Sequence, residues 1–172
     1  MKLLDYKNWS AKKILKELAI MALIVFVASN VFSYLRKPDL QDSHLPKIQS
    51  ELVSGELFDS KKFEGKPLLI HFWATWCPVC KTEAGNIQTV SEYYNVLSIA
   101  VKSGSNEEIR SYLKEQGVDY RVINDVGSKW ARMYSVGVFP TTFVYNSKGE
   151  IAFSEVGYTS TIGLLARMWW AQ

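Results

Sequence analysis

Cysteine and histidine are scarce in this chain, which has two of each among its 172 residues. A small scaffold held together by disulfides carries four or more cysteines, so that class is excluded. A zinc site takes four ligands, and His44 lies far from the cysteines in a polar stretch. We therefore expect no metal and no cofactor. The two cysteines, Cys77 and Cys80, form a redox pair, a structural pair or an idle one.

An excess of basic charge is also missing from most of the chain. Residues 1–37 hold seven basic and two acidic side chains, a net charge of +5. Residues 38–172 hold 13 basic and 15 acidic side chains, a net charge of −2. Proteins that read nucleic acid carry their basic patch on the folded domain, so we expect no nucleic-acid partner.

One long uncharged run is present near the N-terminus. Residues 18–35 (LAIMALIVFVASNVFSYL) reach the lower length limit of a transmembrane helix. Five lysines precede the run, so the positive-inside rule places the N-terminus in the cytoplasm and the domain outside. The alternatives are a cleaved signal peptide, with a poor cleavage site at residues 27–29, and a buried helix of a soluble domain. An uncleaved anchor and a cleaved signal peptide both export the domain, so either one places Cys77 and Cys80 in a compartment where disulfides persist.

The run divides the chain into four predicted parts. We expect a cytoplasmic basic tail over residues 1–17, a transmembrane anchor over 18–35, a linker over 36–50 and a folded domain over 51–172. The linker is polar and contains Pro38 and Pro46, as extended linkers do.

Hydrophobic patterning predicts an α/β domain after the linker. We expect strands over 52–58, with a turn or bulge at Gly55, and over 68–74, 96–101, 120–123, 143–145 and 151–156. Helices are expected over 78–94, 105–117, 128–134 and 161–170. Parallel pairing comes first and a hairpin last, which gives a mixed central sheet flanked by helices. In the last helix, Ile162, Leu165 and Trp169 recur at helical spacing and are expected to pack on the sheet. Membrane contact by residues 168–170 is the alternative.

The two cysteines lie where a buried strand ends and a helix begins near Pro78. Free N–H groups and the helix dipole stabilise negative charge at that end of a helix, and cysteines there have pKa values of ~3.5–7.5 rather than ~8.5. We therefore expect Cys77 to be the nucleophile and Cys80 to resolve the mixed disulfide. A stable but idle disulfide is the alternative, although its loop is too short to restrain the unfolded chain much.

Several motifs together resemble the thioredoxin superfamily. They are residues 72–80 (FWATWCPVC), Glu83, residues 138–143 (VFPTTF) and Gly149. The resemblance covers about residues 50–172 and is nearest to the membrane-anchored TlpA-like and cytochrome-c-maturation thioredoxins. The short anchor with Cys-Pro-Val-Cys also resembles the suppressor-of-copper-sensitivity D family, which is linked to copper tolerance.

This resemblance implies a thioredoxin fold and a thiol–disulfide oxidoreductase that reduces disulfides of exported proteins. It also implies a single-pass protein of the inner membrane whose catalytic domain faces the periplasm, with a membrane thiol reductase as the electron donor. Two other functions stay open on the residues. One is disulfide donation by the same cysteines. The other is a tethered copper-binding protein, because thiolates suit Cu(I). A non-catalytic docking module is a further alternative.

The resemblance also assigns roles around the cysteines. Pro140, which by sequence alone is either an ordinary trans proline opening a strand or a cis one, would be the family's cis-proline facing the disulfide. The backbone of Phe139 would pair with a substrate peptide. Trp76 and the turn at Val156 and Gly157 would complete an apolar docking surface.

Two ionisable residues complete the predicted site. Glu83 is either a partly buried carboxyl whose raised pKa lets it relay the proton of Cys80 or a solvated glutamate in the first turns of a helix. His71 stands where cytoplasmic thioredoxins carry a buried aspartate. It is either a proton relay, which would favour the thiolate if charged, or a hydrogen-bonded histidine of the core.

Overall fold

The computed structural model describes residues 11–35 and 43–172, and the chain divides into two units, residues 1–36 and 37–172. The first unit contains helix α1 (Ala11–Leu35), which includes the whole uncharged run. Among the residues described, no helix has the length and apolar character needed to span a bilayer. The predicted cytoplasmic tail up to residue 10 and the predicted linker over residues 36–42 lie outside the described residues.

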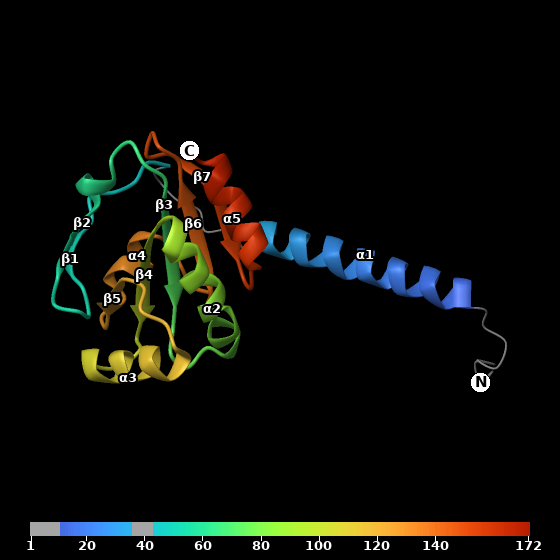
Figure 1. Cartoon of the computed structure of the whole chain (residues 1–172), viewed down its shortest axis with the longest axis horizontal. Coiled ribbons are helices and arrows are strands. Elements are labelled where there is room, and N and C mark those ends of the chain that lie inside the picture. The colour runs from blue at the N-terminus through green and yellow to red at the C-terminus, as the bar shows by residue number, and fades with distance from the viewer. Residues whose placement is uncertain (1–10, 36–42) are drawn as a thin grey trace. The chain divides into compact units, whose positions relative to one another are not determined.

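The second unit is built on a five-stranded mixed sheet with the strand order β5-β4-β3-β6-β7 (Figure 1). The strands are β3 (Leu68–Trp73), β4 (Asn95–Val101), β5 (Val122–Asp125), β6 (Thr141–Tyr145) and β7 (Ile151–Val156). β3 and β4 pair in parallel, as do β4 and β5, whereas β3–β6 and β6–β7 are antiparallel. The predicted mixed sheet, with parallel pairing first and a hairpin last, is confirmed.

Helices cover both faces of this sheet. They are α2 (Pro78–Tyr93), α3 (Asn106–Gln116), α4 (Lys129–Met133) and α5 (Thr161–Trp170). Successive side chains of a strand point to opposite faces, so Leu69 and Trp73 pack with α2 and α5, whereas Ile70 and Phe72 pack on the side of α4. Every residue of β3 is buried, because strands lie on both of its edges and apolar layers on both of its faces.

The predicted strand over residues 52–58 is wrong for residues 52–56, whereas Leu57 and Phe58 do lie in a strand. Residues 52–56, with Gly55 among them, form the turn of a hairpin between β1 (Gln49–Glu51) and β2 (Leu57–Asp59). The short helix η2 (Ser60–Phe63) follows β2. Leu52 and Val53 lie in the turn but are only 4% exposed, and the N–H of Val53 donates to the carbonyl of Val122 at 2.8 Å. Their burial explains why an apolar turn has the pattern of a strand.

Residues 43–50 of the predicted linker are part of the folded unit. Ile48 is fully buried, the N–H of Leu45 donates to the carbonyl of Gly149 at 2.7 Å, and His44 forms a β-bridge with Glu150. The folded part therefore begins several residues before the predicted boundary at residue 51.

The predicted buried stripe of α5 is wrong for two of its three residues. Leu165 is partly buried and packs against the core, but Ile162 and Trp169 are 81% and 66% exposed. Leu164 and Met168 are the fully buried residues of this helix. Apolar residues occupy both sides of this helix, so helical spacing alone does not select the side that packs. The contacts with α2 select it.

Candidate active site around the Cys77–Cys80 disulfide

Cys77 and Cys80 are joined by a disulfide in the first turn of α2, with their Cα atoms 5.3 Å apart. Cys77 is the N-cap residue, and Pro78 follows at the start of the helix, where its missing N–H is not needed. The backbone N–H of Cys80 donates to Sγ of Cys77 at 3.2 Å. This donor and the helix dipole stabilise negative charge on Cys77 once the disulfide is reduced.

Both cysteines are buried in the oxidised pair. Cys77 is 6% exposed and Cys80 is 2% exposed, and both belong to the apolar cluster between the sheet and α2. Their exposures are too similar to distinguish the two, so the N-cap position of Cys77 and its contact with the N–H of Cys80 are what favour it as the attacking sulfur.

A loop before β6 faces the disulfide. The Phe139–Pro140 peptide bond is cis, and Sγ of Cys77 lies 3.7 Å from the carbonyl oxygen of Phe139. The same loop is bound to the residue that follows β7, because the N–H of Gly157 donates to the carbonyl of Pro140 at 2.8 Å. The structure thus brings together Cys77, Pro140 and Gly157 from three distant parts of the sequence.

Trp76 extends this surface outward. Its side chain is 61% exposed, and its ring meets that of Phe139 edge-on with the centroids 5.7 Å apart. The indole N–H donates to the carbonyl of Lys102 at 3.2 Å, and the N–H of Thr75 donates to Oγ of Ser103 at 3.1 Å. The loop after β4 therefore fixes the orientation of the Trp-Cys segment.

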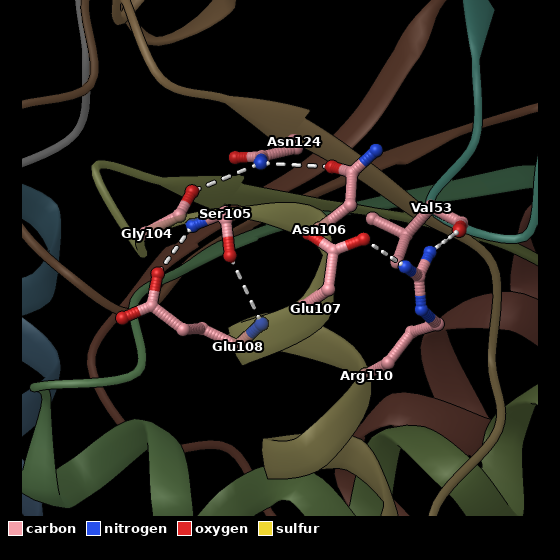
Figure 2. Close-up of polar contacts among 8 residues, drawn as sticks. All are labelled: Val53, Gly104, Ser105, Asn106, Glu107, Glu108, Arg110 and Asn124. Atoms are coloured by element: carbon pink, nitrogen blue, oxygen red, sulfur yellow. Dashed lines mark hydrogen bonds and ion pairs between the residues drawn. The ribbon is translucent and has the colours of Figure 1, made fainter.

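Polar contacts at the start of α3 hold that loop in place (Figure 2). The side-chain amide of Asn124 donates to the carbonyl of Gly104 at 3.0 Å and to Oδ1 of Asn106 at 2.9 Å. Ser105 and Glu108 form a capping box in which each side chain accepts the backbone N–H of the other. Gly104 has φ +90°, a conformation that favours glycine, and a Cβ there would push the carboxylate of Glu108 out of the capping box.

Glu83 is fully buried one turn after Cys80, so the solvated alternative is wrong. Its Oε1 accepts the backbone N–H of Thr159 at 2.8 Å. Among the described residues, its Oε2 has no hydrogen-bond partner. Burial raises the pKa of Glu83 from 4.5 to about 7, although the N–H of Thr159 acts in the opposite direction. Glu83 is thus a carboxyl that exchanges its proton near neutral pH.

His71 lies on β3, and its side chain is buried on the same face of the sheet as Leu69 and Trp73. Its Nδ1 is 2.9 Å from Oγ1 of Thr142 on β6. Burial lowers the pKa of His71 to about 3, so the imidazole is neutral at physiological pH. A charged histidine that favours the thiolate is therefore excluded, and the hydrogen-bonded core histidine fits the geometry.

Sequence reasoning missed the partners of these residues. Thr159 lies 76 residues after Glu83, and Thr142 lies 71 residues after His71. Thr159 contributes only a backbone N–H, so its side chain gives no signal in the sequence. Within the described part of the chain, no three His, Cys, Asp or Glu side chains gather as a metal site requires.

The fold and the disulfide agree with comparisons to known proteins. The chain belongs to the Redoxin family, whose model matches residues 40–164. It is similar to a thioredoxin-like protein of Haemophilus influenzae, with 29% identity over 163 residues that cover 94% of this chain and 96% of the relative. It is also similar to the thiol-disulfide oxidoreductase ResA of Bacillus subtilis, with 27% identity over 115 residues and 64% of each chain covered.

A solved structure matches the same architecture. The thiol:disulfide interchange protein of Chlorobium tepidum superposes with a TM-score of 0.69 at 25% identity, covering 77% of this chain and 98% of that protein. Family, fold and the Cys-x-x-Cys disulfide together define the chain as a thiol–disulfide oxidoreductase of the thioredoxin fold.

Proposed function

We propose that this oxidoreductase reduces disulfides of exported proteins while tethered to the membrane. One observation carries the chemistry. Cys77 is the N-cap of α2, accepts the N–H of Cys80 and lies beside the carbonyl of Phe139. A sulfur in that position is stabilised as a thiolate and is adjacent to a backbone edge on which a peptide can align.

The proposed reaction begins with the reduced pair. The Cys77 thiolate attacks one sulfur of a substrate disulfide, a Cys77–substrate disulfide forms, and the other substrate sulfur leaves as a thiolate that takes a proton from water. Cys80 then loses its proton and attacks Sγ of Cys77. The Cys77–Cys80 disulfide forms, and the second substrate sulfur leaves as a thiolate that takes a proton from water. Two electrons have passed from the protein dithiol to the substrate, and a second dithiol protein must restore them.

Glu83 is the proposed acceptor of the Cys80 proton. It lies three residues after Cys80 on α2, so both side chains lie on the same side of the helix. Its pKa of about 7 suits a group that takes a proton and returns it near neutral pH. His71, with its pKa lowered to about 3, is a much weaker base, so we assign the relay to Glu83.

The proposed docking surface consists of Trp76, Phe139, Pro140 and Gly157. The Phe139 carbonyl is the acceptor that a substrate backbone N–H would use, as in β-strand addition. The exposed indole of Trp76 offers apolar contact to the residues around the substrate cysteine. A backbone hydrogen bond of this kind does not depend on the substrate's side chains, so we expect the surface to accept more than one exported protein.

The proposed location rests on the N-terminal segment. Residues 18–35 carry no charge, and α1 is one continuous helix through them. The match to the Haemophilus influenzae relative covers 94% of this chain and so includes most of this helix. We propose that the segment anchors the domain on the periplasmic face of the inner membrane and that a membrane thiol reductase supplies the electrons. The link to copper tolerance stays a prediction.

Replacement of Cys80 with alanine tests the mechanism in the full chain. The Cys80→Ala protein, offered a disulfide-bonded peptide, is expected to accumulate a mixed disulfide that reductant releases. The Cys77→Ala control is expected to form none. If Cys80→Ala forms no adduct, the exchange mechanism is wrong.

The reduction potential of the Cys77–Cys80 pair decides the direction of electron flow. Equilibration with glutathione and trapping of the free thiols measure it. A value near that of thioredoxin, about −270 mV, supports a reductant. A value near that of DsbA, about −120 mV, would replace reduction with disulfide donation by the same residues.

A further inference from the structure

Two side chains of α2 hold the loop over residues 157–161. Glu83 accepts the N–H of Thr159 at 2.8 Å. The side-chain amide of Asn86 donates to the carbonyl of the same residue at 2.9 Å, and Oγ1 of Thr161 donates to Oδ1 of Asn86 at 2.8 Å. Both the N–H and the carbonyl of Thr159 are thus bound to one helix, one turn apart.

This arrangement determines which oxygen of Glu83 is engaged. Oε1 is occupied by Thr159, whereas Oε2 is buried and has no hydrogen-bond partner among the described residues. Because Oε1 accepts a hydrogen bond and Oε2 does not, Oε2 is the atom left to receive a proton. The N–H of Thr159 can stay on Oε1 only while the loop stays on the helix.

We propose that Asn86 is a positioning residue for thiol–disulfide exchange, because it fixes Thr159 and so keeps the proton-accepting carboxyl of Glu83 in place. The inference rests on the proton-acceptor role given to Glu83 under the proposed function. The same loop carries Gly157, whose N–H donates to the carbonyl of Pro140 at 2.8 Å. The docking surface and the proton acceptor therefore share one support.

The expected effect follows from the direction of the hydrogen bond. The N–H of Thr159 lowers the pKa of Glu83 against the effect of burial. When Asn86 is lost, the carbonyl of Thr159 loses its partner, and the N–H of Thr159 donates to Oε1 of the buried Glu83 less often. The carboxylate is then stabilised less, so it accepts the Cys80 proton only at higher pH.

The test is the rate of the second step, in which Cys80 releases glutathione from a Cys77–glutathione disulfide in the full chain, measured between pH 5 and pH 9 for wild type and Asn86→Ala. We expect the midpoint of the pH profile to move up by about one pH unit, which is an approximately tenfold lower rate on the acid side of the midpoint. Gln88→Ala is the matched control, because Gln88 holds another loop on the same helix. Its amide donates to Asp119 at 2.8 Å and accepts the N–H of that residue at 2.9 Å.

The variants separate the possible outcomes. An unchanged midpoint in Asn86→Ala, or an equal shift in Gln88→Ala, overturns the inference. Glu83→Gln tests the proposed function itself. If this variant leaves the pH profile unchanged, the proton-acceptor role of Glu83 is wrong. If Glu83→Gln changes the profile and Asn86→Ala does not, only the role of Asn86 is rejected. If Asn86→Ala does not fold, Thr161→Val is the second variant, because it removes the hydrogen bond from Thr161 to Asn86. We expect the midpoint of its pH profile to move in the same direction by a smaller amount. No shift there rejects the inference.

Discussion

Replacement of Glu83 with glutamine should change how the stability of the protein depends on pH. Burial favours the protonated form of this carboxyl in the folded state. Below pH 4.5 the carboxyl is protonated in both the folded and the unfolded state, so its burial costs least. Between pH 4.5 and about 7 the unfolded state ionises while the folded state holds its proton, so stability falls as the pH rises. Above pH 7 the loss is complete.

The size of this loss follows from the pKa. A rise from 4.5 to about 7 corresponds to about 3 kcal/mol of unfolding free energy, because each factor of ten in proton affinity is ~1.36 kcal/mol. Glu83→Gln cannot ionise, and its amide oxygen can still accept the N–H of Thr159. Any cost of the buried amide N–H groups is the same at every pH. The stability of Glu83→Gln relative to wild type should therefore rise by about 3 kcal/mol between pH 4.5 and pH 7.5.

Urea unfolding of the oxidised full chain at a series of pH values measures this difference. Titration of His71 is common to both proteins and cancels in the comparison. Glu92→Gln is the control, because Glu92 is exposed on the same helix, and it should follow the wild-type pH dependence. A constant difference between Glu83→Gln and wild type from pH 4.5 to pH 7.5 would refute the assignment of a buried, proton-holding carboxyl.

Three further predictions concern stability. Burial lowers the pKa of His71 from 6.5 to about 3, so the neutral histidine stabilises the fold above pH 6.5 and this stabilisation is lost as the pH falls. Wild type should therefore lose about 3 kcal/mol of unfolding free energy from this residue between pH 7 and pH 4.5, and His71→Gln should not show that loss in urea unfolding. Leu164→Ala should cost about 2–5 kcal/mol and Ile162→Ala less than about 0.5 kcal/mol in the same assay, and equal losses would contradict the buried side of α5. Gly104→Ala should cost about 1–3 kcal/mol in thermal unfolding, because the position has φ +90° and faces Glu108, whereas Gly127→Ala, with open space around it, should cost less.

Local signals account for the parts of the fold that could be predicted from the sequence. Residues 68–73 form a short apolar run that is bounded by Pro67 and the cysteine motif, and they become the central strand β3. Ser105 and Gly117 begin and end α3 as the capping rules require. Each signal lies within a few residues of the structure it produces, so no distant contact is needed to interpret it.

Local sequence patterns do not predict the structure where the burial of a residue depends on distant segments of the chain. Leu52 and Val53 look like part of a strand but form a buried turn, because β5 lies against them. Ile162 and Leu164 are equally apolar, and only the packing against α2 decides that Leu164 is buried. A periodic pattern identifies an apolar side chain, but it does not identify what covers it.

The sequence by itself determined the redox pair and its setting, because a Cys-x-x-Cys motif between a buried strand and a helix start is a local pattern. The tertiary structure alone decided the state of Glu83. That carboxyl is buried, and one of its oxygens accepts the N–H of Thr159, 76 residues away. A pKa depends on desolvation and on hydrogen bonds, and both are set by chain segments that only folding brings to the site.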